Sequence, residues 1–375
     1  MNEFDRTAKR LLVVLVVVTA SVALDRGQPV FLPLVLGLFA IATAWPVVRW
    51  LERWVTEPIA IGGAVVVVLL VAVTIGGAFV WSTAAIVEAA PRLTARVPEL
   101  CQRTADWLIP RGIGEPGKWC TGGPELWLRG ATRPFVASVY STTLVLGLAF
   151  AYLVLGLIEV HDVERRLSLR LPQRSASIIA GIRTITTKVR RHLVALTISS
   201  AVSGAATGVF TLAAGLELAA TWGIVTFLLN YIPTVGPAVA IIPPTAYALL
   251  QFDSLTRALV VFGGVGAIQF VMGNFVDPKI EGRVVSLSPF VVLLSIVLWG
   301  WIWGAFGALL AVPIVIAVVV TCEHFEGTRW IAALVSGPRR GTSAASLLAQ
   351  ERDRRADASE HPIADRPSPT SRRSG

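Results

Sequence analysis

A long apolar run in the second half of the chain is interrupted by residues that a continuous helix cannot accommodate. The run extends from Leu218 to Leu250, and its middle, Asn230 to Pro244, has the sequence NYIPTVGPAVAIIPP with four prolines. Proline lacks a backbone donor and clashes with the preceding turn, so a helix here must kink or end. Inside a membrane, broken backbone is tolerated only where protein or a water-filled cavity covers it. The interruption therefore indicates a transport site.

The composition places this run in a membrane protein. Hydrophobic residues make up 54% and charged residues 15% of the 375 residues, whereas soluble proteins carry about 25% charged residues. Apolar runs of about 20 residues, the length that crosses a bilayer, recur along the chain. The net charge of +9 comes from Lys and Arg beside apolar segments and in the tail, which is typical of cytoplasmic anchoring, so we expect no nucleic-acid partner. The expected fold is an all-α polytopic membrane protein with about eight transmembrane segments.

The chain divides into five regions along its length. Residues 1–81 hold three spans, 82–133 a polar arm, and 134–192 a fourth span followed by a basic loop. Residues 193–322 form a transport core, and 323–375 a cytoplasmic, largely disordered tail. The uninterrupted spans are predicted at Leu11–Leu24, Val30–Val48, Ile59–Trp81, Phe135–Ile158, Leu193–Leu216 and Leu255–Phe275.

Charge fixes the expected orientation of these spans. The connection Glu159–His192 is densely basic, and the positive-inside rule places it in the cytoplasm. Both termini are then cytoplasmic and the arm, Ser82–Arg133, lies outside. The arm begins with an amphipathic helical pattern, and its Cys101 and Cys120 are a candidate disulfide pair. Small residues crowd the fifth span, Leu193–Leu216, and predict close helix packing there.

A second overlong apolar run follows the sixth uninterrupted span. It extends from Phe290 to Thr321 and is interrupted by Gly300, Gly304 and Gly307, with tryptophans interleaved. A span followed by a broken run thus occurs twice. If each broken run is a re-entrant hairpin, the two halves form an inverted repeat around a midplane site. The alternative is that each run crosses the membrane once with a kink and a tilt.

Two stretches of the core resemble motifs of the AI-2E family of bacterial membrane proteins, named for autoinducer-2 exporters. The first is NYIPTVGPAVAIIPP, and the second is QFVMGNFVDPKIEGRVVSLSPFVVLLSIVLWGWIWGAFGALLAVPI, which begins at Gln269. The resemblance covers Leu11 to Val320, and it departs at the tryptophan-rich interruption and at Ser288. It implies a permease of the bacterial inner membrane that works as an oligomer. The activities it implies are export of autoinducer-2 or exchange of sodium for protons.

The candidate substrate or ion pathway is drawn from the core. Asn230 adjoins the first interruption, where its amide and freed carbonyls offer groups to a polar solute or a sodium ion. The alternative for isolated polar residues is hydrogen bonding between helices, and for Asn274 and Asp277 it is capping of the turn at Pro278. The candidates are Asn230, Tyr231, Pro233, Gly236, Pro237, Gln269, Asn274, Asp277, Gly304 and Gly307.

Three functions remain in view. The first is export of a small polar solute or signal molecule, the second is sodium(cation)/proton antiport, and the third is a non-transporting membrane scaffold. No acidic residue is expected in the middle of a span, which weighs against a carboxylate-based antiporter. No catalytic motif and no metal-spaced His or Cys cluster occurs, so we expect no enzyme, cofactor or metal. The expected partners are a small molecule or ion, membrane lipids and further copies of the chain.

Overall fold

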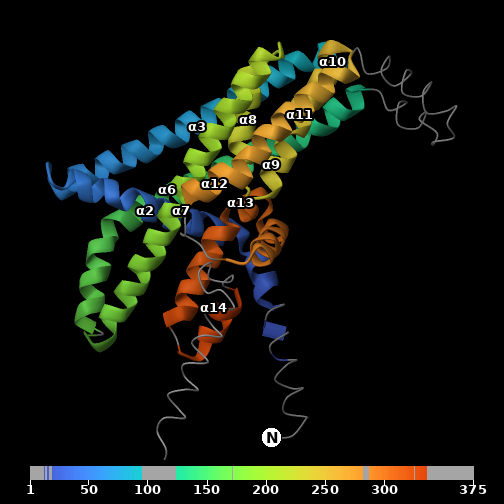
Figure 1. Ribbon diagram of the computed structural model, residues 1–375. Helices are drawn as coiled ribbons and strands as arrows, with labels where there is room; N and C mark the ends of the chain where they lie inside the picture. Colours follow the sequence, from blue (N-terminus) through green and yellow to red (C-terminus); the bar gives the residue numbers. More distant parts are fainter. Residues whose placement is uncertain are drawn as a thin grey trace, which may run out of the picture.

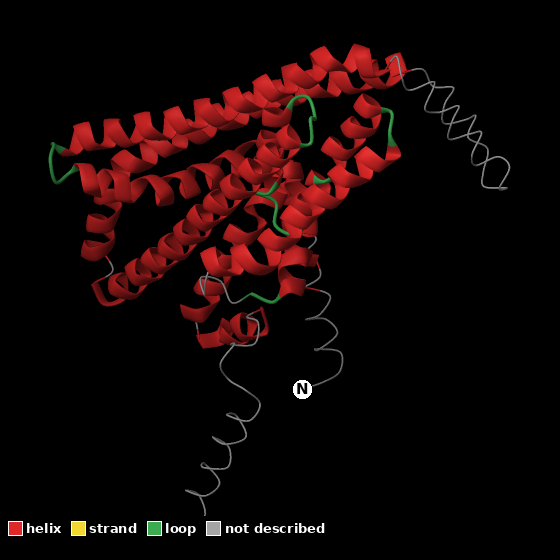
Figure 2. Cartoon of the chain, turned by 45° about the horizontal axis from the view of Figure 1, so that its top comes forward, coloured by secondary structure: helices red, strands yellow, loops and turns green. Residues whose placement is uncertain are grey.

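The computed structural model describes residues 19–94, 124–170, 172–281, 287–324 and 326–335, and three further positions between 12 and 16. These residues form a bundle of helices joined by short turns (Figure 2). Seven helical segments among them are long and apolar enough to cross a membrane. This confirms the all-α polytopic class. The first predicted span, Leu11–Leu24, lies only partly within the described residues.

The amino-terminal spans form one side of the bundle (Figure 1). Helix α2 (Gln28–Leu51) turns back into α3 (Glu57–Thr94), and both pack against α6 (Pro124–Arg170) through small and apolar side chains. Helix α3 continues through Trp81, where the third span was predicted to end. Residues 95–123, which include both cysteines of the candidate disulfide, lie outside the described residues.

The basic connection is helical rather than an open loop. Helix α6 carries it to Arg170, and α7 (Pro172–Ala213) carries it on into the fifth span. Its arginines and leucines are good helix formers, and Pro172 occupies the first helical position, where proline is tolerated. At 1.5 Å per residue, the 42 residues of α7 extend about 63 Å, twice the hydrocarbon thickness.

The first interrupted run folds back on itself. It consists of α8 (Ala219–Leu229), a break at residues 230–234, then α9 (Val235–Ala240) and α10 (Ile242–Phe252). Its two ends are tied together by one side chain: Gln251 accepts a hydrogen bond from the Glu217 amide (2.8 Å) and donates one to the Gly215 carbonyl (3.0 Å). The rings of Trp222 and Tyr247, on opposite limbs, lie 5.2 Å apart. The run is therefore a helical hairpin.

Backbone strain marks the start, the tip and the end of this hairpin. Leu218, Thr234 and Asp253 have φ angles of 57°, 61° and 48°, and they are the non-glycine residues with positive φ in the described part of the chain. Such angles are costly for residues with a side chain and persist where surrounding packing enforces them. At the tip, a Cβ on Gly236 would lie 1.9 Å from the Leu229 carbonyl oxygen. Only glycine permits this close approach of the two limbs.

The second interrupted run also folds back. Helix α13 (Pro289–His324) loses helical geometry at Trp303 and at Gly304, whose φ is +61°, and it is bent in Figure 1. A Cβ on Gly307 would lie 1.9 Å from the Trp299 carbonyl oxygen. In a straight helix, residues eight apart are separated by about 12 Å along the axis. The glycines predicted to break this run thus allow its two limbs to meet.

The first interruption contacts the limbs of the second hairpin. Ile232, in the first break, packs against the buried cluster of Ile296, Ala308 and Ala311 on the two limbs of α13. The tip of α13 is also fixed from the other side, because the Trp303 indole donates a hydrogen bond to the Leu24 carbonyl (3.1 Å). The two broken runs therefore meet within the bundle.

The paired ends of the first hairpin lead to a topology prediction. We expect cysteines placed at Glu217 and Asp253, in a cysteine-free background, to react with a membrane-impermeant maleimide from the same side of the membrane. A cysteine at Thr56, in the turn between α2 and α3, should react from the opposite side. A single kinked crossing predicts that the first two cysteines label from opposite sides, and that result would rule out a re-entrant hairpin.

Candidate functional site

A face of α7 carries buried hydroxyl groups. Ser199 is 7% exposed, while Ser200, Ser203 and Thr207 are fully buried. Residues three or four apart on a helix share a face, so these side chains form a polar stripe along α7. The stripe is directed toward the end of α8 and toward α11 (Leu255–Val271). Hydroxyls in this position are available to partners on both neighbouring helices.

Two buried amides meet the stripe. The Oε1 atom of Gln269, on α11, accepts hydrogen bonds from the Ser203 hydroxyl (3.1 Å) and from the Asn230 side-chain amide (3.5 Å). Gln269 is 6% exposed and Asn230, which ends α8, is 8% exposed. These three residues, which we call the amide cluster, connect α7, α8 and α11. The residue at the first interruption thus lies inside the bundle, as part of a polar contact between three helices.

The amide cluster leaves hydrogen-bonding capacity unused. The Oδ1 atom of Asn230 and the Nε2 atom of Gln269 are buried without a partner among the described residues. If both amides were rotated by 180°, the hydrogen bonds would reverse and again leave one donor and one acceptor. The hydroxyls of Ser200 and Thr226, one turn from the cluster on α7 and α8, are likewise buried and unpaired. Buried polar groups without partners are costly, and they are expected where a ligand supplies the missing bonds.

A carboxylate is bonded to α7 at Ser199, one helical turn before Ser203 of the amide cluster. Helix α11 passes into a π-helical segment, η2 (Met272–Val276), and then into α12 (Asp277–Glu281). Asp277 is half-buried and accepts a hydrogen bond from the Ser199 hydroxyl. Because a π-helical turn inserts an extra residue, it rotates the side chains that follow, and such turns are frequent at functional sites. The sequence predicted that Asp277 lies at the end of a segment. In the structure its carboxylate contacts Ser199 of α7.

The remaining predicted residues have different positions. The Tyr231 hydroxyl donates a hydrogen bond to Thr197 on α7 (2.9 Å), on a more exposed side of the contact. Asn274 is exposed and donates to the carbonyl of Phe270 in its own helix (2.8 Å), so it lies outside the amide cluster. The others shape the backbone of the two interruptions: Pro233, Gly236, Pro237, Gly304 and Gly307.

Sequence reasoning missed the hydroxyl partners. The small residues of the fifth span, which include Ser199, Ser200 and Ser203, predicted close helix packing, and no prediction was made for Thr226. The spacing of these serines, three and four residues along α7, was the available signal, because it predicts one shared polar face. What that face contacts depends on residues 66 and 78 positions away in the chain, as the Ser203–Gln269 and Ser199–Asp277 bonds show.

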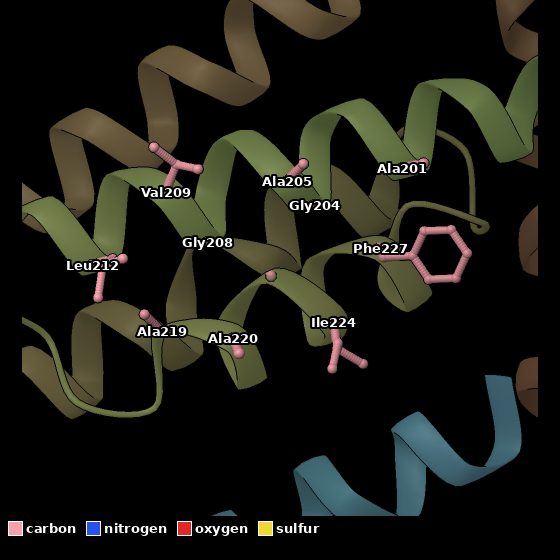
Figure 3. Close-up of a pocket in the computed structure, with 11 residues that line it drawn as sticks. Ala201, Gly204, Ala205, Gly208, Val209, Leu212, Ala219, Ala220, Ile224 and Phe227 are labelled. Carbon is pink, nitrogen blue, oxygen red and sulfur yellow. The ribbon is translucent and has the colours of Figure 1, made fainter. Parts of the chain in front are cut away.

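The close packing predicted for the fifth span is found beside the amide cluster. A Cβ on Gly204 of α7 would lie 2.6 Å from the carbonyl oxygen of Gly223 on α8. On the outer side of this contact the helices leave an apolar groove of about 540 Å³ (Figure 3). Its lining, which includes Ala201, Val209 and Phe227, contains none of the predicted pathway residues. The groove suits apolar chains, whereas a polar solute needs the amide cluster.

The buried polar side chains and the interrupted helices are features of one class of membrane protein. Polar side chains buried among membrane-spanning helices are costly and mark substrate or ion pathways. Interrupted helices that meet near such side chains are characteristic of secondary transporters. Among the described residues, no group of three His, Cys, Asp or Glu side chains is placed to hold a metal ion. The chain is a multi-pass membrane protein of the transporter class.

Comparison with known proteins identifies the family. Residues 11–327 match the model of the AI-2E family transporter, and the chain belongs to this family. It is 36% identical over 180 residues to AI-2 transport protein TqsA of Escherichia coli (strain K12), a match covering 48% of this chain and 52% of TqsA. It is 27% identical over 352 residues to YhhT of the same strain, a proposed transport protein, covering 90% of this chain and 97% of YhhT. The chain thus spans about half of TqsA and nearly all of YhhT.

A mycobacterial relative extends the comparison. The chain is 26% identical over 326 residues to MT0215 of Mycobacterium tuberculosis (strain CDC 1551 / Oshkosh), also a proposed transport protein, with 82% of this chain and 86% of MT0215 covered. The family resemblance read from the two core motifs is confirmed, and membership of a transporter family agrees with the absence of catalytic motifs in the sequence.

Proposed function

We propose that the chain exports a small, uncharged polar solute through a site formed by the amide cluster. The observation that carries this proposal is the unused capacity of Asn230 and Gln269, one acceptor and one donor, beside the unpaired hydroxyls of Ser200 and Thr226. A solute with hydroxyl or carbonyl groups can satisfy both kinds of atom. Because such bonds replace those the solute makes with water, its entry into the membrane costs less.

The charges around the cluster favour an uncharged solute. The cluster itself is neutral, and no Lys or Arg side chain among the described residues hydrogen-bonds to it. An anion would therefore lack a positive partner, and a bare cation would find the neutral Asn230 Oδ1 acceptor next to the unpaired Gln269 Nε2 donor. The name of TqsA, a transport protein for the signal AI-2, is compatible with a small polar cargo.

The hairpins suggest how such a solute passes. In this proposal both broken runs are re-entrant in the inner membrane, with the termini cytoplasmic, and their contact at Ile232 lies near the midplane. Alternating access then requires movement of one hairpin relative to the other. In the same proposal, the basic parts of α6 and α7 lie on the cytoplasmic side and contact lipid headgroups. Several copies of the chain assemble in the membrane.

The test is efflux from proteoliposomes loaded with autoinducer-2 or, as a second probe, a neutral pentose. We expect Asn230→Ala to reduce efflux at least about tenfold, which corresponds to about 1.4 kcal/mol of lost interaction. Asn274→Ala is the matched control, because its exposed amide bonds only to its own helix. Equal efflux in wild type and Asn230→Ala, with both proteins folded, would contradict the site.

Cation/proton antiport is the second candidate, and Asp277 is the observation that favours it. A carboxylate bonded to Ser199, which lies one turn before Ser203 of the amide cluster, is suited to carry a proton. The same proteoliposomes, with a pH-sensitive dye inside and a sodium gradient, separate the two functions. Sodium-driven proton movement that disappears in Asp277→Asn, without efflux of either solute, would establish antiport in place of export. No flux of any kind from folded protein would favour a scaffold.

A further inference from the structure

Five buried hydroxyl groups lack a hydrogen-bond partner among the described residues. They belong to Ser82 on α3, Ser200 and Thr207 on α7, and Thr221 and Thr226 on α8, and each residue is at most 1% exposed. We call this set the hydroxyl seam. Ser200 and Thr226 adjoin the amide cluster, and Thr207 belongs to the polar stripe of α7. Ser82 and Thr221 have no role in the site described above.

A partner was available within the same helix to four of them. The exception is Thr221, because Glu217, four residues earlier, precedes the start of α8. Serine and threonine in helices commonly donate to the carbonyl four residues earlier. Thr83, the neighbour of Ser82, does so to Phe79 (2.8 Å), and the fully buried Thr211 does so to Thr207 (2.8 Å). The same bond is made by Thr43, Thr74, Thr184, Thr197, Thr245, Ser295 and Thr321. Ser82, Ser200, Thr207 and Thr226 therefore do not make a hydrogen bond that other serines and threonines of the chain commonly make.

The seam follows α8 from the amide cluster toward its opposite end. Thr226 precedes Asn230 by one turn, and Thr221 lies near the start of α8, beside Glu217, which is exposed at the hairpin's open end. Thr207 is the next member of the polar face of α7 after Ser203. Ser82 lies on α3, whose side chains Ile86 and Ala89 pack against the hydrophobic cluster that contains Trp222 of α8. The hydroxyls are thus distributed along the helix that connects the amide cluster with the open end.

The size of the ligand is limited by the packing of α7 on α8. The backbones of Gly204 and Gly223 approach so closely that neither position has room for a methyl group. A solute cannot pass between them, but a water molecule needs only about 10–15 Å³ of free space and two to four polar partners. Each unpaired hydroxyl can both donate to and accept from water.

We propose that the hydroxyl seam binds ordered water, and that this water connects the amide cluster with the open end of the first hairpin near Glu217. When no solute is bound, this water provides the hydrogen-bond partner that each hydroxyl of the seam lacks within the helices. The binding of water to the seam does not depend on the proposed export function. The role of this water as a path that hydrates the solute site from one side does rest on that function.

Radiolytic hydroxyl labelling of the full chain in lipid nanodiscs tests the water directly, because bound water is the source of the radicals. Trp222 and Trp303 are a matched pair: each is 3% exposed and donates its N–H to a backbone carbonyl. Both tryptophans lie in apolar clusters, but Trp222 follows Thr221 directly and precedes Thr226 by one turn, whereas Trp303 is on α13, which carries no member of the seam. We expect Trp222 to be oxidised at least about fivefold faster than Trp303. Equal rates would overturn the proposal.

Valine variants provide the second arm. Thr207→Val and Thr226→Val should bring the Trp222 rate down toward that of Trp303, while Thr211→Val, one turn along the same helix, should leave it unchanged. The unfolding temperatures of the two seam variants are an independent test. Removing a hydroxyl that is bonded to water lowers the unfolding temperature, whereas removing a buried hydroxyl without a partner raises it. A rise in both seam variants would overturn the proposal.

The labelling needs no substrate, so its outcome is separate from that of the export assay. Fast oxidation of Trp222 with normal efflux in Asn230→Ala would leave the water in place and remove the proposed function. Slow oxidation with lost efflux would do the reverse.

Discussion

Gln269→Leu will abolish solute efflux while the protein still inserts and folds. The side chains are close in volume, so the change removes hydrogen bonds and little packing. Gln269 accepts from both Ser203 and Asn230, and its replacement leaves two buried polar groups without a partner. We expect a destabilisation of about 1–3 kcal/mol and efflux at the level of empty liposomes, measured in the proteoliposome assay with autoinducer-2.

A graded variant separates the amide pair from its hydroxyl support. Ser203→Ala removes one of the two bonds to Gln269 and leaves the contact with Asn230 intact. Its efflux should fall between those of wild type and Gln269→Leu. If Gln269→Leu exports at the wild-type rate, the amide cluster is a packing contact between helices and the solute passes elsewhere.

Gly236→Ala and Gly307→Ala will each prevent a hairpin from closing. At both glycines a methyl group would lie 1.9 Å from a carbonyl oxygen, of Leu229 and Trp299 respectively, so the backbone must move apart. Overpacking of this kind costs about 1–3 kcal/mol or more. We expect a lower unfolding temperature in detergent for both variants, and loss of transport because the two hairpins no longer meet.

Gly77→Ala and Gly263→Ala are the matched controls. At either position a methyl group would have no atom within 4 Å, and both positions lie within helices. Alanine is the better helix former by about 1 kcal/mol, so these variants should be unchanged or slightly more stable. If all four alanine variants show the same change in unfolding temperature and transport, the close backbone approach at Gly236 and Gly307 is not what the hairpins require.

Much of the architecture was predictable because it depends on local chemistry. The lengths and composition of the apolar runs predicted a polytopic helical protein, and the prolines and glycines predicted both interruptions at their observed positions. Asn230 was selected for its place beside the first break, and it does lie buried in the bundle. The basic region after the fourth span was predicted less well. Its charges predicted the side of the membrane on which it lies, but its helix-forming residues were not used to predict that it is helical.

The pairing of distant residues was not predictable from one sequence. Gln269 and Asn274 are both amides near the end of one predicted span, yet the first joins α7 and α8 while the second bonds to its own helix. Helix rotation decides between them, and the π-helical segment that changes this rotation has no marker in the residue pattern. The serines of α7 acquired a polar role only when their partners were placed.

The residue pattern was sufficient to predict a multi-pass helical protein with two interrupted apolar runs, because helix length and proline geometry are set by neighbouring residues. The folded chain was needed to show that each run folds back, that Ile232 packs against the second run, and that Asn230 shares a hydrogen-bond acceptor with Ser203. These facts depend on contacts between residues far apart in the chain. Such contacts are fixed by the packing of whole helices against one another.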